Sequence, residues 1–333
     1  MDKNQTPSQK SIVGILVSLI APFEHHIANG GEKLLGNASS IKRRPDGKVY
    51  VSGQMQRHVF FSALKRLNEL EKKEYALQKS KEQGNGNNET EFDITKTFVS
   101  NADGISEDIT HDLRADLGGY MHTQSDTVSE RRTGALSVTV AVAKEDSKVK
   151  NDLINRVVIK PDTNPTLATK EFSEHDDMIM NFYLDLNALS VTEVPNYPEE
   201  HKGWNVSVDY NSHGVDAKER KRRAKLFLQA TSLMNDYANQ SRNAVCGEPE
   251  KVVIVFDTIA SRKASRYLTA SEEVKEKVQK NIKEELKARG AKLFDGDDKT
   301  DKSVHNAYKE ALEYLETVEL YSPATNNMDN QNA

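Results

Sequence analysis

The sequence has little cysteine: Cys246 is the single one among 333 residues. One cysteine excludes a disulfide framework, and it cannot supply the ligand set of a structural zinc. This scarcity fits a reducing, cytoplasmic location. His111, Asp112 and Asp116 lie close together, but no further ligand pattern accompanies them, so a polar loop is the expected structure there. The sequence therefore predicts no metal and no cofactor.

Apolar runs long enough to cross a bilayer are also missing. Ile12 to Ala21 is apolar, but it is shorter than the roughly 20 residues that a spanning helix needs. No small-residue cleavage site follows it, and Pro22-Phe23-Glu24 would be unusual after a signal peptide. Its aliphatic and β-branched side chains instead predict a buried strand over residues 12–20, covered on both faces.

The chain lacks a net positive charge, which taken alone argues against nucleic-acid binding. It has 46 Lys+Arg against 51 Asp+Glu, a formal charge of −5. The distribution is uneven, because residues 1–81 hold 14 basic and 7 acidic side chains, leaving 32 and 44 for the remainder. A local basic surface is sufficient to bind phosphate, since that interaction is short-ranged and screened by salt.

The segment 52–73 has the spacing of an amphipathic helix. Its apolar residues recur at intervals of three and four, which predicts one buried face. They are Met55, Val59, Phe60, Ala63, Leu64, Leu67 and Leu70.

The start of this helix has the features of an anion site. Ser52 is a suitable N-cap, and Gly53 allows another backbone to approach closely. Arg57 lies three residues after Gln54, so the two share a face. Free amides and the positive end of the helix dipole favour a phosphate there. An ordinary capped helix with a charged surface is the alternative.

Further basic residues lie near this helix in the sequence. Lys42, Arg43 and Arg44 precede it, followed by the turn Pro45-Asp46-Gly47. They could face phosphate or form a solvated charge run. Arg131 and Arg132 are weaker candidates for phosphate binding.

The core elements predict an α+β fold of the ferredoxin-like or RRM-like type, a βαββαβ palm with long insertions. The predicted strands are 12–20, 135–143, 178–187 and 251–257. The predicted helices are 52–73 and 216–239, the latter opened by the capping box Asp216-x-x-Glu219 and carrying exposed basic residues over 218–225. A further charged helix is expected over 271–289.

The predicted organisation is one domain over residues 11–320, between a loose N-terminus (1–10) and a disordered tail (321–333). The expected insertions are a loop over about 21–50, a finger-like or helical segment over 74–134 and a projecting hairpin over 144–175.

Four segments together resemble a known family. They are Leu35-Gly36-Asn37, residues 51–58 (Val-Ser-Gly-Gln-Met-Gln-Arg-His), residues 112–121 (Asp-Leu-Arg-Ala-Asp-Leu-Gly-Gly-Tyr-Met) and residues 131–136 (Arg-Arg-Thr-Gly-Ala-Leu). Over roughly residues 12–257 the chain resembles the Cas-seven (Cst-two/DevR-like) backbone subunit of type I CRISPR Cascade complexes, with subtype I-B as one candidate and the subtype left open.

This resemblance implies an RRM-like palm with an inserted thumb, polymerised along a CRISPR RNA. It implies that the loop and helix around Ser52 to Arg57 bind the RNA backbone, and it places the thumb at 144–175 by position. The implied partners are CRISPR RNA, the target DNA strand, further copies of the chain, other Cascade subunits and a downstream nuclease-helicase or transposition proteins, with no membrane.

Three functions follow from the sequence. The first is a non-catalytic RNA-binding subunit that holds phosphates through Lys42, Arg43, Arg44, Ser52, Gln54, Arg57, Arg131 and Arg132, and leaves base recognition to guide–target pairing. The second is a metal-dependent endoribonuclease. Its candidate residues are Asp46, Asp103, Asp108, Asp116, His25 and His26. The third is a structural assembly protein without nucleic acid.

Overall fold

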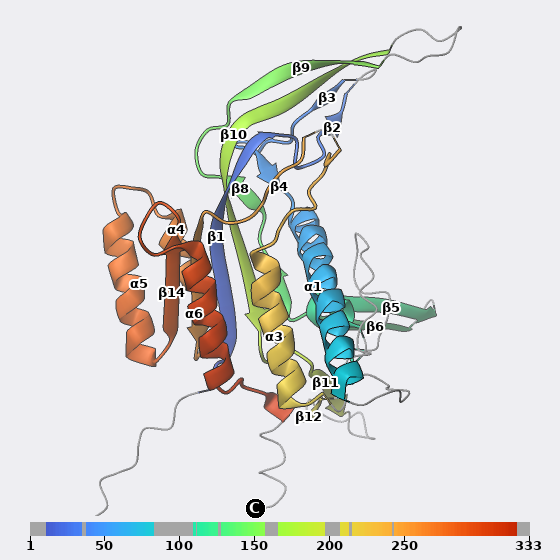
Figure 1. The fold of residues 1–333 in the computed structure, drawn as a ribbon, viewed down its shortest axis with the longest axis vertical. Coiled ribbons are helices and arrows are strands. Elements are labelled where there is room, and N and C mark those ends of the chain that lie inside the picture. Colours follow the sequence, from blue (N-terminus) through green and yellow to red (C-terminus); the bar gives the residue numbers. More distant parts are fainter. Residues whose placement is uncertain are drawn as a thin grey trace, which may run out of the picture.

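The computed structural model describes residues 11–34, 38–82, 109–110, 112–125, 128–156, 166–196, 207–212, 215–241 and 243–324. The architecture is mixed, with helices packed on a large sheet (Figure 1). Leu35-Gly36-Asn37, Asp103, Asp108 and His111 lie outside the described residues, as do residues 1–10 and 325–333.

The sheet is antiparallel through its centre. Its main path runs β14–β13–β1–β10, and the short strands β7 and β8 also pair with β10. These strands are β1 (Gly14–His26), β7 (Leu136–Val138), β8 (Ala141–Ala143), β10 (Thr166–Asp185), β13 (Lys251–Asp257) and β14 (Lys292–Asp297). Strand β13 has the predicted limits.

Two central strands are longer than predicted. β1 continues to His26, so the loop predicted to begin at residue 21 begins later. β10 is a strand of 20 residues, and it pairs with β1 from Gly14↔Asp185 to His26↔Ser173. The glycines after His26 end the strand, and Pro22 is accommodated inside it. Long mutual pairing overrides the local turn signals.

The strand predicted over 135–143 is interrupted. β7 pairs Val138 with Phe182, whereas β8 pairs Ala143 with Met178. One extra residue therefore lies between the two pairings, which is a β-bulge, and it exchanges the two faces. Strict alternation along 135–143 would bury Val140 with Leu136, but Val140 is 43% exposed. Ala141 and Ala143 are buried in its place.

Helices α1 (Gly53–Glu82), α3 (Ala217–Thr231) and α6 (Val304–Thr317) cover one face of the sheet (Figure 1). The α1 stripe is buried as predicted at Val59, Phe60, Ala63 and Leu64, but Leu70 is 56% exposed. At that turn Glu71 faces α3 instead, where it binds Arg222 and Lys225. The prediction for Leu70 was wrong because the stripe drifts around a straight helix.

The end of α3 differs from the prediction. Asp216 is confirmed as the N-cap, since its carboxylate accepts from the Glu219 amide at 2.7 Å, while the Glu219 carboxylate binds Arg222 and Arg223. The helix ends at Thr231 rather than at 239, although Met234 and Tyr237 remain buried in the core. The irregular segment after Thr231 is buried, so its apolar residues continued the helical spacing in the sequence beyond the end of the helix.

The opposite face of the sheet is covered over β13 and part of β1. Helices α4 (Arg266–Thr269) and α5 (Lys275–Arg289) follow the 3₁₀ turn η1 (Lys263–Ser265). Together with Ile282 of α5 they cover the sheet residues Leu16, Val253 and Val255. This half of the sheet is therefore covered on both sides, as its continuous apolar runs predict. β14 and α6 were not predicted.

The end of the predicted finger-like or helical segment (74–134) contains a short helix where a polar loop was expected around His111, Asp112 and Asp116. Asp112 caps the short helix α2 (Leu113–Gly118), all six residues of which are buried. The hairpin of β5 (Gly119–Ser125) and β6 (Val128–Thr133) follows directly. A second hairpin joins β11 (Thr192–Asn196) to β12 (Ser207–Asn211). The charged residues of α2 suggest an exposed segment, but the helix is buried because their polar groups form hydrogen bonds inside the protein.

A ribbon projects from one end of the sheet (Figure 1). It is formed by β9 (Val149–Arg156) and by residues 166–173 of β10, and it is called the arm below. β2 (Glu32–Lys33) and β3 (Ser39–Ser40) lie beside it, and β4 (Tyr50–Val51) pairs with β8. Leu153 and Leu167 are 65% and 57% exposed on the arm.

Candidate nucleic-acid interface

Helix α1 begins as predicted, with Ser52 as its N-cap. The Ser52 hydroxyl accepts from the Met55 amide at 3.3 Å, and its carbonyl accepts from the Gln56 amide. Within the described part of the chain, the amides of Gly53 and Gln54 have no hydrogen-bond acceptor. Gln54 is exposed. The helix therefore presents two free N–H groups and its positive dipole end to the surface.

Arg57 lies one turn into α1 and is held from a distant segment. Its guanidinium Nη2 donates to the Gly118 carbonyl at 2.7 Å, and the side chain is half-buried. Gly118 is the last residue of α2. This contact orients Arg57 while using one of its five donors, so the others can bind an anion.

Glycines bring the segments 112–121 and 131–136 into backbone contact. A Cβ on Gly134 would lie 2.3 Å from the Gly118 carbonyl carbon, and one on Gly119 would lie 2.4 Å from the Arg132 carbonyl oxygen. Gly119 also has φ of +75°. Larger residues would separate the strands here. Three of the four segments that carried the family resemblance thus meet beside the start of α1.

Arg132 does not face a ligand. It is 8% exposed, and its guanidinium donates to five acceptors inside the protein. The prediction of Arg132 as a phosphate contact is corrected, because the side chain is buried and bonded to internal groups. The backbone of Arg131 pairs with Met121 in β5–β6, and its side chain lies outside the described residues.

The basic residues before α1 form the edge of a small hairpin. Arg43 pairs with Val49 across the turn that contains Gly47, whose φ is +83°. The Arg43 guanidinium binds Glu171 of the arm at 3.1 Å, and the Arg44 guanidinium binds Asp46 at 3.3 Å. Both arginines are exposed and Lys42 is half-buried. Residues 42–48, called the basic loop below, thus link the α1 N-terminus to the arm.

Two residues that the sequence reasoning missed hold this loop. The Asn29 side-chain amide donates to the carbonyls of Lys42 and Tyr50 at 3.0 and 3.1 Å. Glu171 accepts from the Ile41 amide at 3.1 Å as well as from Arg43. The asparagine before Gly30-Gly31 was a usable turn signal, whereas no local pattern marks Glu171.

An interior ion network lies behind this surface. The Asp116 carboxylate is fully buried and accepts from Arg132 at 2.9 Å, Arg223 at 2.6 Å, and the amide and hydroxyl of Ser190 at 2.8 Å each. Burial by itself would lower the pKa of Arg223, but Asp116 and Glu219 raise it. The network holds α2 to α3 and to the turn after β10.

The basic first part of α3 was predicted to be exposed, and this is wrong for two of its arginines. Arg220 and Arg223 are 4% and 0% exposed. Arg220 donates to the carbonyls of Leu189, Leu186 and Tyr321, and burial lowers its pKa. These guanidiniums can lie inside because carbonyls and carboxylates satisfy their donors.

The candidates for a nuclease centre are dispersed. His26 is buried and its Nε2 lies 2.9 Å from the Asp176 carboxylate, whereas His25 stacks against Phe172 of the arm. Asp46 lies in the basic loop and Asp116 in the interior network. Over the described residues, no group of three or more histidine, cysteine or carboxylate side chains could hold a metal.

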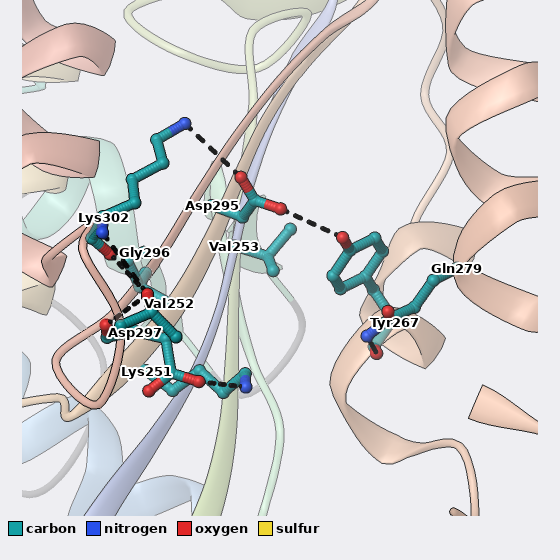
Figure 2. Close-up of a pocket in the computed structure, with 10 residues that line it drawn as sticks. Lys251, Val252, Val253, Tyr267, Gln279, Asp295, Gly296, Asp297 and Lys302 are labelled. Atoms are coloured by element: carbon teal, nitrogen blue, oxygen red, sulfur yellow. Dashed lines mark hydrogen bonds and ion pairs between the residues drawn. The ribbon is translucent and has the colours of Figure 1, made fainter. Parts of the chain in front are cut away.

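Two cavities have no lining residue from the basic loop or from the start of α1. One, of about 360 Å³, opens between β13–β14 and helices α4–α5, and its carboxylates are already bonded (Figure 2). Asp295 accepts from Tyr267 at 3.0 Å and pairs with Lys302, while Asp297 pairs with Lys251. The other, of about 270 Å³, lies at the arm base and is lined by Glu145, Asp146, Lys148, Glu174, His175, Asp176 and Asp177.

Comparison with known proteins places this geometry in context. A family model described as "CRISPR-associated negative auto-regulator DevR/Csa2" matches residues 18–257. The matched residues include most of β1, the basic loop, the start of α1 and the arm. A comparison with curated proteins found no match. In the described part of the chain, every helix is too short or too polar to span a membrane.

Two solved structures have a similar fold. One is a chain of a "CRISPR RNA-guided surveillance complex", 14% identical, with a TM-score of 0.50, covering 90% of this chain and 99% of its own. The other is a chain of a "CRISPR RNA-guided surveillance complex, pre-nicking", 12% identical, with a TM-score of 0.52, covering 91% and 99%. At this identity the likeness concerns the fold.

Proposed function

The chain belongs to the DevR/Csa2 family of CRISPR-associated proteins, and from this premise we propose that it is the CRISPR RNA-binding backbone subunit of a type I surveillance complex. Copies of the chain polymerise along the guide RNA and present it for pairing with the target DNA strand. Base sequence is recognised by that pairing, and the protein holds the RNA backbone.

The observation that carries the proposal is the surface formed by the α1 N-terminus, Arg57 and the basic loop. Free amides of Gly53 and Gln54, a half-buried arginine and the exposed Arg43 and Arg44 lie on connected elements. Amides at a helix start and guanidinium groups both bind phosphate oxygens without reading a base. Such a surface suits a repeating backbone.

In this proposal the domain organisation is a palm with insertions. The strand order β13–β1–β10–β7/β8, with α1 and α3 on one face, supports an RRM-like βαββαβ palm over about residues 11–320. The arm is its thumb. Leu153 pairs with Thr169 on the arm, so Leu167 is its diagonal neighbour on the same face. These exposed apolar side chains suit a neighbouring copy in a head-to-tail assembly.

We further infer that the subunit is non-catalytic. Asp116 is saturated by arginine and serine donors, and His26 is bound to Asp176, so neither side chain is available to activate water. Other subunits of the complex and a downstream nuclease-helicase or transposition machinery then act on the target. Adding Mg²⁺ or Mn²⁺ to the purified protein and RNA should leave the RNA intact.

The direct test is to extract the nucleic acid that copurifies with the chain expressed beside its own CRISPR array. Discrete RNAs of repeat–spacer length are expected, and they should be lost in the Arg57→Glu variant. A nucleic-acid-free wild type would support the structural assembly alternative. RNA that is cleaved in a metal-dependent way would support the nuclease.

The thumb assignment has its own test, a Gly-Ser linker in place of residues 152–168. This cut retains Lys170, which pairs with Ser39, and Glu171, which binds the basic loop. The variant should stay folded and bind short RNA, but fail to assemble on long RNA in size-exclusion chromatography with light scattering. Wild-type assembly by the variant would contradict the thumb role.

A further inference from the structure

We propose that Arg132 is a positioning residue, which clamps the last turn of α2 so that the Gly118 carbonyl fixes Arg57 for phosphate binding. The inference rests on the proposed function and assigns a role to a buried arginine that does not touch the ligand.

The first step is the clamp itself. Arg132 Nη1 donates to the carbonyls of Ala115 and Asp116 at 3.0 and 2.6 Å, and Nη2 donates to the Asp116 carboxylate at 2.9 Å. These carbonyls lie in the last turn of a six-residue helix. A cation at a helix C-terminus is favoured by the dipole. The Ala115 carbonyl also accepts from the Gly119 amide that caps the helix, so Arg132 adds a second donor to this turn.

The clamp is anchored outside α2 as well. Arg132 Nη2 also donates to the carbonyls of Ala188 at 2.6 Å and Val191 at 3.3 Å, in the segment after β10. Asp116 is bonded on its other side to Arg223 of α3. The position of α2 is therefore set by the core of the molecule, because both ends of this ion pair are tied to it.

The second step leads from α2 to Arg57. Gly118 lies two residues after Asp116, and the Gly118 carbonyl accepts from Arg57 at 2.7 Å. The contact is close enough that a Cβ on Gly118 would lie 2.9 Å from Arg57 Nη2 and 3.1 Å from the Phe61 ring. Displacement of the last α2 turn would release the guanidinium, which would then lose its preorganised position at the anion site.

Burial excludes the simpler role of direct phosphate binding. Arg132 is 8% exposed, and its guanidinium donates to carbonyls and a carboxylate inside the protein. The two roles also differ in what a charge-conserving substitution does. A lysine would retain a phosphate contact as a point charge, but its single ammonium cannot bridge carbonyls on both sides as the planar guanidinium does.

The experiment measures the affinity for a short single-stranded RNA by fluorescence anisotropy over a series of salt concentrations. The proteins are the wild type, Arg57→Gln, Arg132→Lys, the double variant and the control Arg289→Lys. Arg289 of α5 also forms an ion pair, a bidentate one to Asp257 of β13 at 2.8 and 2.6 Å, and its other carboxylate partner is Glu285 of α5. Circular dichroism checks that each variant is folded.

Arg57→Gln should weaken binding about tenfold, by removing a charge-assisted contact, and lower the slope of log K against log salt by about 0.7. Arg132→Lys should do the same although it removes no charge. In the Arg57→Gln background, Arg132→Lys should have no further effect. Arg289→Lys should leave affinity and slope unchanged.

Equal losses from Arg132→Lys in the wild-type and Arg57→Gln backgrounds would overturn the inference while leaving the proposed function intact. Unchanged binding by Arg132→Lys would overturn it too. A wild type that does not bind RNA would instead refute the proposed function. If Arg132→Lys fails to fold, Gly118→Ala tests the same contact, since its methyl group displaces Arg57 directly; it too should be silent in the Arg57→Gln background.

Discussion

Two groups of arginines in this chain have opposite environments. Arg43 and Arg44 lie on the basic loop, with side chains 41% and 47% exposed and one carboxylate partner each. Arg132, Arg220 and Arg223 are buried, and carbonyls and carboxylates surround them. Both groups come from short basic runs that look alike in the sequence.

The difference shows what each arginine is free to do. Exposed ion pairs contribute little to folding, so Arg43 and Arg44 can exchange a carboxylate for a phosphate at low cost. A buried guanidinium has lost its hydration, and its partners must remain in place. We therefore expect the interior group to determine stability and the surface group to determine RNA affinity. Four variants compare the interior of the protein with this surface.

The largest effect is expected from Arg223→Met. Removing this side chain leaves Asp116 with one arginine partner. It also removes the hydrogen bonds to the Ile109 and Thr110 carbonyls. The free energy of unfolding should fall by about 3–5 kcal/mol, measured by urea denaturation. Arg44→Met is the matched surface control, with an expected change below about 1 kcal/mol. Equal changes in the two variants would end the distinction.

The double variant Arg43→Gln/Arg44→Gln should have the converse effect. Stability should change by less than about 1 kcal/mol, while RNA affinity falls about tenfold and the salt slope decreases by about 1.4 for two phosphate contacts on a single strand. Anisotropy with two unrelated RNA sequences measures both. A loss confined to one sequence would contradict backbone binding.

A smaller effect, with pH dependence, is expected from Asp176→Asn. Burial alone would raise the pKa of Asp176, but hydrogen bonds from His26 and Ser147 hold it below its usual value. A lowered folded pKa contributes stability above the unfolded value of about 3.9, and that contribution is lost as pH falls through the folded value. The free energy of unfolding of the wild type should exceed that of the variant by about 1 kcal/mol at pH 6.

This difference should shrink below about pH 4, as the carboxylate of the wild type protonates. Urea denaturation at pH 6, 4 and 3 measures it. The Arg223→Met difference provides the contrast, since a guanidinium does not titrate in this range. A pH-independent advantage of Asp176 would show that its charge contributes nothing to stability.

The smallest change in stability is expected from Gly53→Ala. A Cβ there would lie 3.5 Å from the Val138 carbonyl oxygen, which is ordinary contact. The free energy of unfolding should therefore change by less than about 0.5 kcal/mol. RNA affinity should nevertheless fall a few-fold, because the methyl group occupies the approach to the free amides. Unchanged affinity would show that the RNA does not come close to this turn.

Much of the palm could be predicted from local patterns. Continuous apolar runs marked β1 and β13, helical spacing marked α1, and capping residues marked the starts of α1 and α3 at Ser52 and Asp216. These features depend on neighbours within a few residues, so the sequence carries them directly. The start of α1 was found for the same reason.

Features that depend on distant partners could not be predicted in this way. The bulge between β7 and β8 arises from register against β10, and the length of β1 arises from the length of β10. The region of α2 was predicted as a polar loop around His111, Asp112 and Asp116. The burial of Asp116 depends on Arg132 and Arg223, which donate to it from elsewhere in the chain.

The sequence by itself determined where α1, α3 and β13 begin and that residues 1–81 are basic, and it predicted an anion site at the start of α1. The tertiary structure decided which arginines face solvent. Charge along the chain records only the type of side chain, whereas burial depends on whether a carboxylate such as Asp116 and unpaired carbonyls are brought within hydrogen-bond distance by residues more than a hundred positions away.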